Sequence, residues 1–264
     1  SLQKEKEGIP MNSITSVVLI FLLYFCDEGR SFIIRYKQGQ QLIGQQLYAI
    51  DDRKSKQRRP WELGRFVQQS SKFLSLPFLS QPKKKIISPK DVLWETSSDL
   101  KFGPLDDVVM GGVSSSTFDN TNGKWCGSVT DANNGGFIGI RSYPIVQYDM
   151  SNCRGIEIRL RGGEGKRFKF ILRDSTDFNG ITWSTSVTMG RKEKENKQDT
   201  ITVQIPFEKQ IPTLNARTVP GQTFRKSLVT GIQVAYSKFE YDGKLNTMFD
   251  LGDMELQILS IKAY

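Results

Sequence analysis

The chain has 264 residues, with 37 Lys and Arg against 28 Asp and Glu, three Cys and no His. Without His, it can have no Ser-His-Asp or Cys-His nucleophile and no zinc site with imidazole ligands. Three separated cysteines exclude a four-cysteine metal site and argue against a disulfide framework, so a reducing compartment is expected. The length suits one large domain or one domain with an appendage, and 25% charged residues exclude a polytopic membrane protein.

Residues 1–30 contain an apolar run, ITSVVLIFLLYFC, at positions 14–26. A transmembrane helix needs about 20 apolar residues, so this run is too short to span a bilayer. Such a run is typical of the core of a targeting signal, of a docking segment, or of a buried helix. We interpret residues 1–30 as a targeting or docking segment, with a plain buried helix as the alternative.

Residues 31–90 are predicted to form an extended basic arm with short helices, of which residues 61–73 are the best candidate. Residues 1–90 carry 16 basic and 7 acidic side chains, whereas the remainder of the chain carries 21 of each. An arm that holds the whole charge excess favours an acidic partner: a nucleic acid, an anionic lipid surface or a protein.

Arginine and large apolar side chains are interleaved along this arm. Linkers are poor in such residues, whereas Arg and aromatic residues supply most anchors at protein interfaces. We therefore predict a partner-binding arm, with a poorly ordered linker as the alternative. The predicted partner-binding residues are Arg35, Tyr36, Arg58, Arg59, Trp61, Arg65, Phe66, Phe73 and Phe78.

Residues 91–264 are predicted to form an all-β domain. The segments GIEIRLRG (155–162) and RFKFILRD (167–174) alternate apolar and polar residues, which is typical of half-buried strands. Further strands are expected at 125–129, 136–141, 182–189, 200–206, 231–236 and 254–263. About eight strands, spaced too closely for crossover helices, predict a β-sandwich or jelly roll and disfavour a parallel α/β sheet.

Two glycine-containing strings are predicted to shape the backbone. DDVVMGGVSSSTF (106–118) opens with paired carboxylates, but no His or third clustered carboxylate supports an acid–base or metal role. Gly111 and Gly112 are instead expected to permit a tight turn into a strand. In NNGGF, Asn134, Gly135 and Gly136 favour positive φ at a hairpin turn, and Phe137 anchors the next strand.

Two other strings resemble ligand-binding loops but lack side chains that those loops need at defined positions. RGGEGKRFKF (161–170) has Arg167 where a phosphate loop needs Ser or Thr, and it is expected to join two strands as a hairpin loop. DSTDFNG (174–180) resembles a calcium loop only superficially. With Gly180 at the sixth position of such a loop, Ser175 is first and Ser186 is twelfth, where carboxylates are needed. No metal, cofactor or small-molecule substrate is therefore expected.

Five ordered blocks together resemble one family. DDVVMGGVSSSTF, GSVTDANNGGFIGIRS, GIEIRLRGGEGKRFKFILR, VQIPF and SKFEYDGKLNTMFDLGDMELQILSIKAY are similar to the complex I intermediate-associated protein 30 family over about residues 92–264. The resemblance implies a galactose-binding-domain-like jelly roll and an assembly role around respiratory complex I. NNGGF, SKFEYDGKLN and IKAY resemble the photosynthetic, plastid and cyanobacterial branch more closely. Some plastid relatives also carry a dinucleotide-binding domain, which is not expected in this sequence because it contains no GxGxxG motif.

These observations favour a non-catalytic scaffold, linker or assembly protein, with residues 91–264 as docking module and the arm as tether. Because antenna proteins are acidic and their linkers basic, the expected partners are acidic subunits of a photosynthetic complex, most specifically a light-harvesting antenna such as a phycobilisome. No nucleic acid is expected. The expected location is the plastid, on the stromal side of the thylakoid and close to that membrane, with the mitochondrion as alternative. The alternative functions are a transient assembly factor of a photosystem or of complex I, a carbohydrate-binding module, and an enzyme or nucleotide binder.

Overall fold

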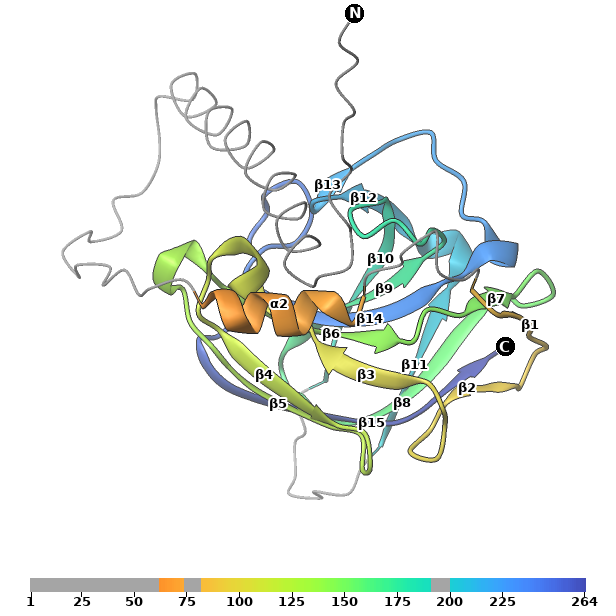
Figure 1. The fold of residues 1–264 in the computed structure, drawn as a ribbon, viewed down its shortest axis with the longest axis horizontal. Coiled ribbons are helices and arrows are strands. Elements are labelled where there is room, and N and C mark those ends of the chain that lie inside the picture. Colours follow the sequence, from red (N-terminus) through yellow and green to blue (C-terminus); the bar gives the residue numbers. More distant parts are fainter. Residues whose placement is uncertain (1–61, 74–81, 191–199) are drawn as a thin grey trace, which may run out of the picture. The chain divides into compact units, whose positions relative to one another are not determined.

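The computed structural model describes residues 62–73, 82–190 and 200–264 (Figure 1). The described part contains one α-helix, α2 (Leu63–Ser71), and four short 3-10 helices, η1 (Asp107–Met110), η2 (Ala132–Asn134), η3 (Phe207–Lys209) and η4 (Lys226–Leu228). No helix in these ranges is long and apolar enough to cross a membrane. The remaining elements are strands, and the all-β prediction is confirmed.

Most strands form two sheets that face each other (Figure 1). The seven-stranded sheet has the order β13 (Arg217–Thr218), β12 (Ile211–Leu214), β10 (Thr182–Thr188), β9 (Arg167–Arg173), β14 (Gly231–Ser237), β6 (Phe137–Tyr143) and β3 (Lys101–Pro104). The other sheet has the order β11 (Ile201–Pro206), β8 (Gly155–Gly162), β15 (Gly252–Ala263), β5 (Lys124–Val129) and β4 (Ser115–Asp119), with β2 (Val92–Trp94) also paired to β15. All pairs within the two sheets are antiparallel, as expected for a jelly roll.

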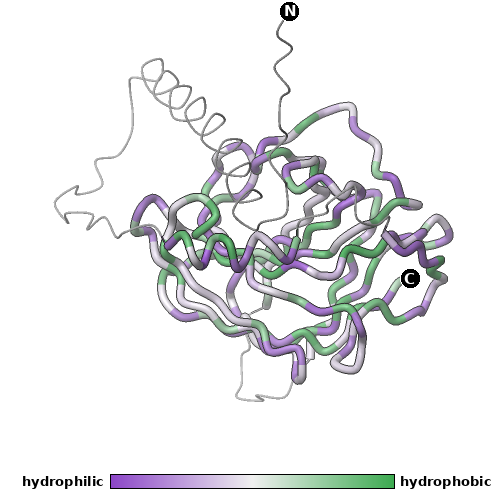
Figure 2. The backbone as a smooth tube through the Cα atoms, in the orientation of Figure 1, coloured by the Kyte–Doolittle hydropathy of each residue, from purple (hydrophilic) through white to green (hydrophobic). Residues whose placement is uncertain are grey.

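The core lies between the two sheets because each contributes the apolar side of an alternating pattern. Figure 2 shows hydrophobic and hydrophilic residues alternating along the strands. In β8, Ile156, Ile158 and Leu160 are buried, and in β9, Phe168, Phe170 and Leu172 are buried, all in one cluster. These six residues were expected to face one core, and the burial confirms it.

The connection between β8 and β9 differs from the predicted hairpin. β8 pairs with β11 and β15, whereas β9 pairs with β10 and β14, so the loop at residues 163–166 crosses from one sheet to the other. The NNGGF string likewise joins β5 in one sheet to β6 in the other. Alternation reports which face of a strand is buried but not which strand lies beside it, so both hairpin predictions were wrong.

The folded domain begins before position 91. Strand β1 (Lys84–Ile86) pairs in parallel with β7 (Gln147–Asp149), and Ile87 is buried in the main core. Helix α2 buries Phe66, Gln69 and Ser70, at the spacing of one helical face. Residues 62–73 and 82–90, which the sequence interpretation gave to the arm, therefore pack on the sandwich.

Candidate functional site

The paired carboxylates Asp106 and Asp107 are buried, and each accepts hydrogen bonds from residues of both sheets or of the segments that lead into them. The Asp106 carboxylate accepts hydrogen bonds from the Ser116 amide at 2.9 Å and hydroxyl at 2.6 Å, and from the Gly139 amide at 3.3 Å. Ser116 belongs to β4, at the edge of one sheet, and Gly139 belongs to β6 in the other. One side chain therefore satisfies backbone donors of both sheets.

Asp107 makes the same kind of connection one residue later. Its carboxylate accepts from the Ser114 amide at 2.9 Å and hydroxyl at 2.7 Å, ahead of β4. It also accepts from the amides of Gly136 at 2.8 Å and Phe137 at 3.4 Å, where β6 begins. The two consecutive carboxylates thus close the sandwich at the corner where β4 and β6 meet; we call Asp106 and Asp107 the carboxylate junction.

The glycines of both strings surround this junction. A Cβ atom at Gly112 or at Gly135 would collide with the Asp107 carboxyl group. Gly111 has φ +90° at the end of η1, and Asn133, Asn134 and Gly136 also have positive φ. Gly135 itself has φ −65°, so its requirement is space for Asp107 and not a left-handed backbone.

Helix α2 docks on the carboxylate junction. Gln69 Nε2 donates to Asp106 Oδ2 at 3.0 Å, and the Asp106 amide donates to Gln69 Oε1 at 2.9 Å. The Arg65 guanidinium donates to the Ser114 carbonyl at 2.9 Å and lies 3.7 Å from Asp106 Oδ2. Residues far apart in sequence are joined here, and the sequence reasoning missed this link because Gln69 lies in no recognisable motif.

Three predicted partner anchors must be reassigned. Phe66 and Phe73 are buried within the described structure, and Arg65 is half-buried on the carboxylate junction. Phe73 packs on Tyr143 of β6 and Arg65 contacts Asp106, so these two side chains join the α2 segment to its own sandwich. Arg35, Tyr36, Arg58, Arg59, Trp61 and Phe78 lie outside the described residues, and their predicted role stays a prediction.

The hydrogen bonds that hold the carboxylate junction are made within the protein. Burial raises the pKa of Asp106, and the hydrogen bonds from Ser116, Gln69 and Gly139 oppose that shift. Every oxygen of the two carboxylates accepts at least one hydrogen bond from the protein. No group of three or more potential metal-ligating side chains occurs among the described residues. The junction is built to hold the fold.

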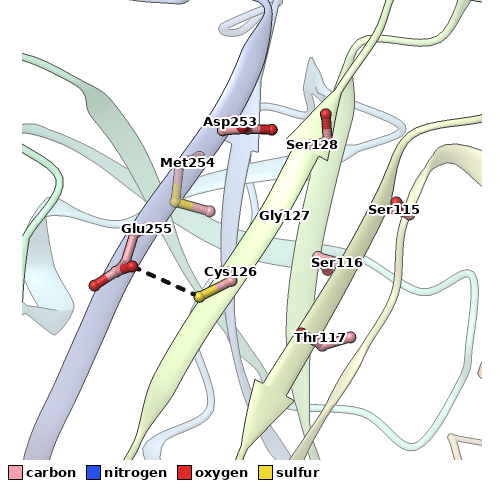
Figure 3. Close-up of a pocket in the computed structure, with 9 residues that line it drawn as sticks. All are labelled: Ser115, Ser116, Thr117, Cys126, Gly127, Ser128, Asp253, Met254 and Glu255. Carbon is pink, nitrogen blue, oxygen red and sulfur yellow. Dashed lines mark hydrogen bonds between the residues drawn. The ribbon is translucent and has the colours of Figure 1, made fainter.

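A shallow groove of about 540 Å³ lies on the outward side of β4, β5 and β15 (Figure 3). It contains Cys126, whose thiol lies 3.9 Å from Glu255 Oε2, and Glu255 is paired with Lys124 at 2.9 Å. Burial raises the pKa of the Cys126 thiol, and Glu255 adds to the shift, so the reactive thiolate is disfavoured at neutral pH. The other lining residues are Ser115, Ser116, Thr117, Gly127, Ser128, Asp253 and Met254.

The carbohydrate-binding alternative requires exposed Trp or Tyr side chains on a concave face. Trp94, Trp125 and Trp183 are buried, with at most 5% of each residue exposed. Their rings pack on core aromatics, Trp94 on Phe102 and Trp125 on Phe168. Within the described ranges the tryptophans are therefore part of the core and do not form an exposed platform.

Comparison with known proteins places the chain in a family. The model of the Complex I intermediate-associated protein 30 (CIA30) family matches residues 92–258. The chain belongs to the CIA30 family. The match spans η1, the carboxylate junction and most of β15, whereas α2 and β1 precede it. No curated protein matches the sequence.

Solved structures similar to this CIA30 chain include two from Clostridium thermocellum. One is a family 11 carbohydrate-binding module in complex with a β-1,3-1,4-mixed-linked tetrasaccharide, at 17% identity and TM-score 0.44, over 67% of this chain and 95% of the module. The other is the family 11 carbohydrate-binding module of the cellulosomal cellulase Lic26A-Cel5E, at 18% identity and TM-score 0.46. That match covers 67% of this chain and 94% of the module. At these identities the similarity concerns the fold alone.

Proposed function

We propose that this chain is a non-catalytic docking protein that assembles or stabilises a multisubunit energy-converting complex. The observation that carries the proposal is membership of the CIA30 family over residues 92–258. The family's name refers to association with an intermediate of complex I, and an assembly-related role follows from it for this chain.

The chemistry of the described residues supports a docking role over catalysis. The carboxylates of the carboxylate junction accept hydrogen bonds from backbone amides and hydroxyl groups. The raised pKa of the Cys126 thiol in the groove favours its protonated form. The chain has no His to activate a nucleophile. In this proposal the domain therefore acts through its binding surfaces.

The finer proposal is a photosynthetic setting. The excess of basic residues before position 91 suits an acidic partner, and antenna subunits of phycobilisome type are acidic. In this proposal the chain is a linker or stabilising subunit on the stromal side of a plastid thylakoid. The sandwich docks on the complex and the arm ties it to an acidic subunit. The close alternative is an assembly factor that leaves the finished complex, in a plastid or in a mitochondrion.

Co-migration in native gels tests this proposal. Membranes and soluble fractions of the source cells are separated by blue-native electrophoresis, and the chain is located by an antibody together with mass spectrometry of the same band. A linker co-migrates with the finished pigment-bearing complex, whereas an assembly factor co-migrates only with smaller intermediates. Migration as a free monomer in every fraction would refute both versions.

A further inference from the structure

The outward face of the seven-stranded sheet carries three buried cations. Arg141 on β6 and Lys169 and Arg173 on β9 are 2%, 8% and 4% exposed. They alternate with the core residues Ile140, Phe170 and Leu172 along their strands, so they point away from the sandwich interior. β14 runs between β6 and β9, with Gln233 opposite Arg141 and Gly231 opposite Arg173. Charged side chains are almost never fully buried unless they are paired, so each needs an explanation.

Two of the three cations have partners. Lys169 Nζ donates to the backbone carbonyls of Phe239 and Glu240. Arg173 donates through one terminal nitrogen to the carbonyls of Asp177 at 2.6 Å and Phe178 at 2.9 Å. The Nε–H of Arg173, however, is buried without a hydrogen-bond partner among the described residues.

Arg141 is different. Within the described ranges its guanidinium forms no ion pair and no hydrogen bond, although it has five N–H donors. Its neighbours are the rings of Phe73 and Phe178, whose centroids lie 5.3 Å and 5.5 Å from Cζ. Aromatic faces attract a cation, but they do not replace the carboxylate oxygens with which guanidinium N–H groups form their strongest hydrogen bonds. Burial and the nearby Arg173 charge lower the pKa of Arg141 to about 9, which reflects the missing counter-charge.

We propose that Arg141, together with the free Nε–H of Arg173, forms a binding site for a carboxylate group. A guanidinium presents parallel N–H groups that match the two oxygens of a carboxylate, and such pairs are among the strongest hydrogen-bonded contacts in proteins. The ring of Phe178 forms an apolar wall that strengthens the interaction by excluding water. The carboxylate comes from a free dicarboxylic acid or from an acidic side chain of a partner protein.

The cover of the site is Phe73. The Phe178 loop is fixed because Arg173 holds the carbonyls of Asp177 and Phe178. Phe73 instead follows the end of α2, and its ring packs edge-on against Tyr143 of β6, with 6.2 Å between the ring centroids. A shift of this ring exposes the Arg141 guanidinium without breaking a strand pair.

Thermal unfolding of the full chain at constant ionic strength tests the site. The probes are glutarate, as a free dicarboxylate, and a Glu-Gly repeat peptide blocked at both ends, as a protein-like source; sodium chloride is the control. The unfolding midpoint should rise by roughly 5 to 10 °C at one hundred times the dissociation constant of an effective probe, and not with chloride. A rise with glutarate alone assigns the site to small acids, and a rise with the peptide assigns it to protein side chains. No rise with either probe, or an equal rise with chloride, overturns the proposal.

Substitutions locate the effect. Arg141→Met should leave the midpoint without probe unchanged or raise it, because an apolar side chain of similar size replaces an uncompensated charge, and it should abolish the response to probe. Lys169→Met is the matched control on the same face: it should lower the midpoint, because two carbonyls lose their donor, and keep the response. Phe73→Ala should keep the response, at equal or lower probe concentration. A full response in Arg141→Met, or a lost response in Phe73→Ala, overturns the proposal. None of these results depends on co-migration with a complex, so the site and the proposed function can fail separately.

Discussion

Gln69 and Asp106 exchange two hydrogen bonds across 37 positions of sequence: the side-chain amide donates at 3.0 Å to the carboxylate and accepts at 2.9 Å from the backbone amide. Both residues are buried, so without Gln69 the backbone amide of Asp106 would be left unsatisfied. The pair fixes helix α2, which lies outside the family match, to the carboxylate junction, which lies inside it.

Replacing Gln69 by Leu should therefore destabilise the domain. The substitution leaves the buried backbone amide of Asp106 without its acceptor, at a cost of about 1 to 3 kcal/mol, and removes one of the two amide donors to Asp106 Oδ2, which keeps the Ser116 amide. Urea unfolding gives the loss directly. Gln68→Leu, one position away on the exposed side of α2, is the control and should change stability by less than about 0.5 kcal/mol. Equal effects of the two changes would contradict the docking of α2.

Asp107→Asn should lose about 2 to 4 kcal/mol although the side chain keeps its size. All four partners of Asp107 are donors, so an amide group would meet at least one of them with its own N–H. Asp131→Asn, at an exposed position in the neighbouring loop, provides the control. Chemical denaturation of both variants is the measurement, and a stable Asp107→Asn protein would show that the junction is not needed to close the sheets.

The pH dependence of stability should carry a signature of Asp106. Burial raises its pKa in the folded state above the ordinary value of 3.8, so protonation favours the folded state. Its contribution is fully present below the unfolded pKa and is lost as the pH rises through the folded pKa. The stability of the wild type relative to Asp106→Asn should thus decrease as the pH rises upward from about 4, as followed by urea unfolding at a series of pH values. If the stability of the wild type relative to Asp106→Asn instead increases with pH, the four hydrogen bonds lower the pKa of Asp106 by more than burial raises it.

Two glycines should respond in opposite directions to Ala. Gly64 lies in α2, where a methyl group added at its Cα would have nothing within 4 Å, and Ala there should stabilise by about 0.4 to 1 kcal/mol. Gly135→Ala places its methyl group against the Asp107 carboxylate and should destabilise by more than that gain. Thermal unfolding of the two variants checks the signs. A neutral Gly135→Ala would mean that the junction can move aside.

Charge in the lysine run should affect association more than folding. Lys83, Lys84 and Lys85 are exposed, and only Lys84 has an acidic neighbour within the described ranges, Asp149 at 3.6 Å. Changing all three to Gln should slow binding to an acidic subunit and flatten its salt dependence, while dissociation and the unfolding midpoint stay nearly unchanged. Stopped-flow binding at several salt concentrations separates the two rates. An effect confined to the dissociation rate would place these lysines inside the contact instead of at its rim.

The sequence was sufficient for the fold class because the strands that carry most of the core are long and strictly alternating. In residues 155–162 the apolar side is buried as expected, whereas residues 168–173 are buried on both sides, because Lys169, Ile171 and Arg173 are covered on the outward face. Short strands such as β3 and β12 were not expected, because three or four residues show no periodicity. The carboxylate junction was recognised as an unusual string, and its structural interpretation rested on the glycines alone. Its partners on α2 and β6 could not be foreseen, since their contacts are set by how the sheets close and not by local pattern.

Strand β15 pairs with β8 on one side and with β5 and β2 on the other, and all three precede it along the chain. Until β15 is inserted, β8 and β5 each present a row of unsatisfied backbone groups to any other chain they meet. Pairings between segments so distant form slowly, because the loops that join them must first be closed. The half-assembled sandwich is thus the stage at which this protein is most exposed to aggregation, and at which a folding chaperone would help it most.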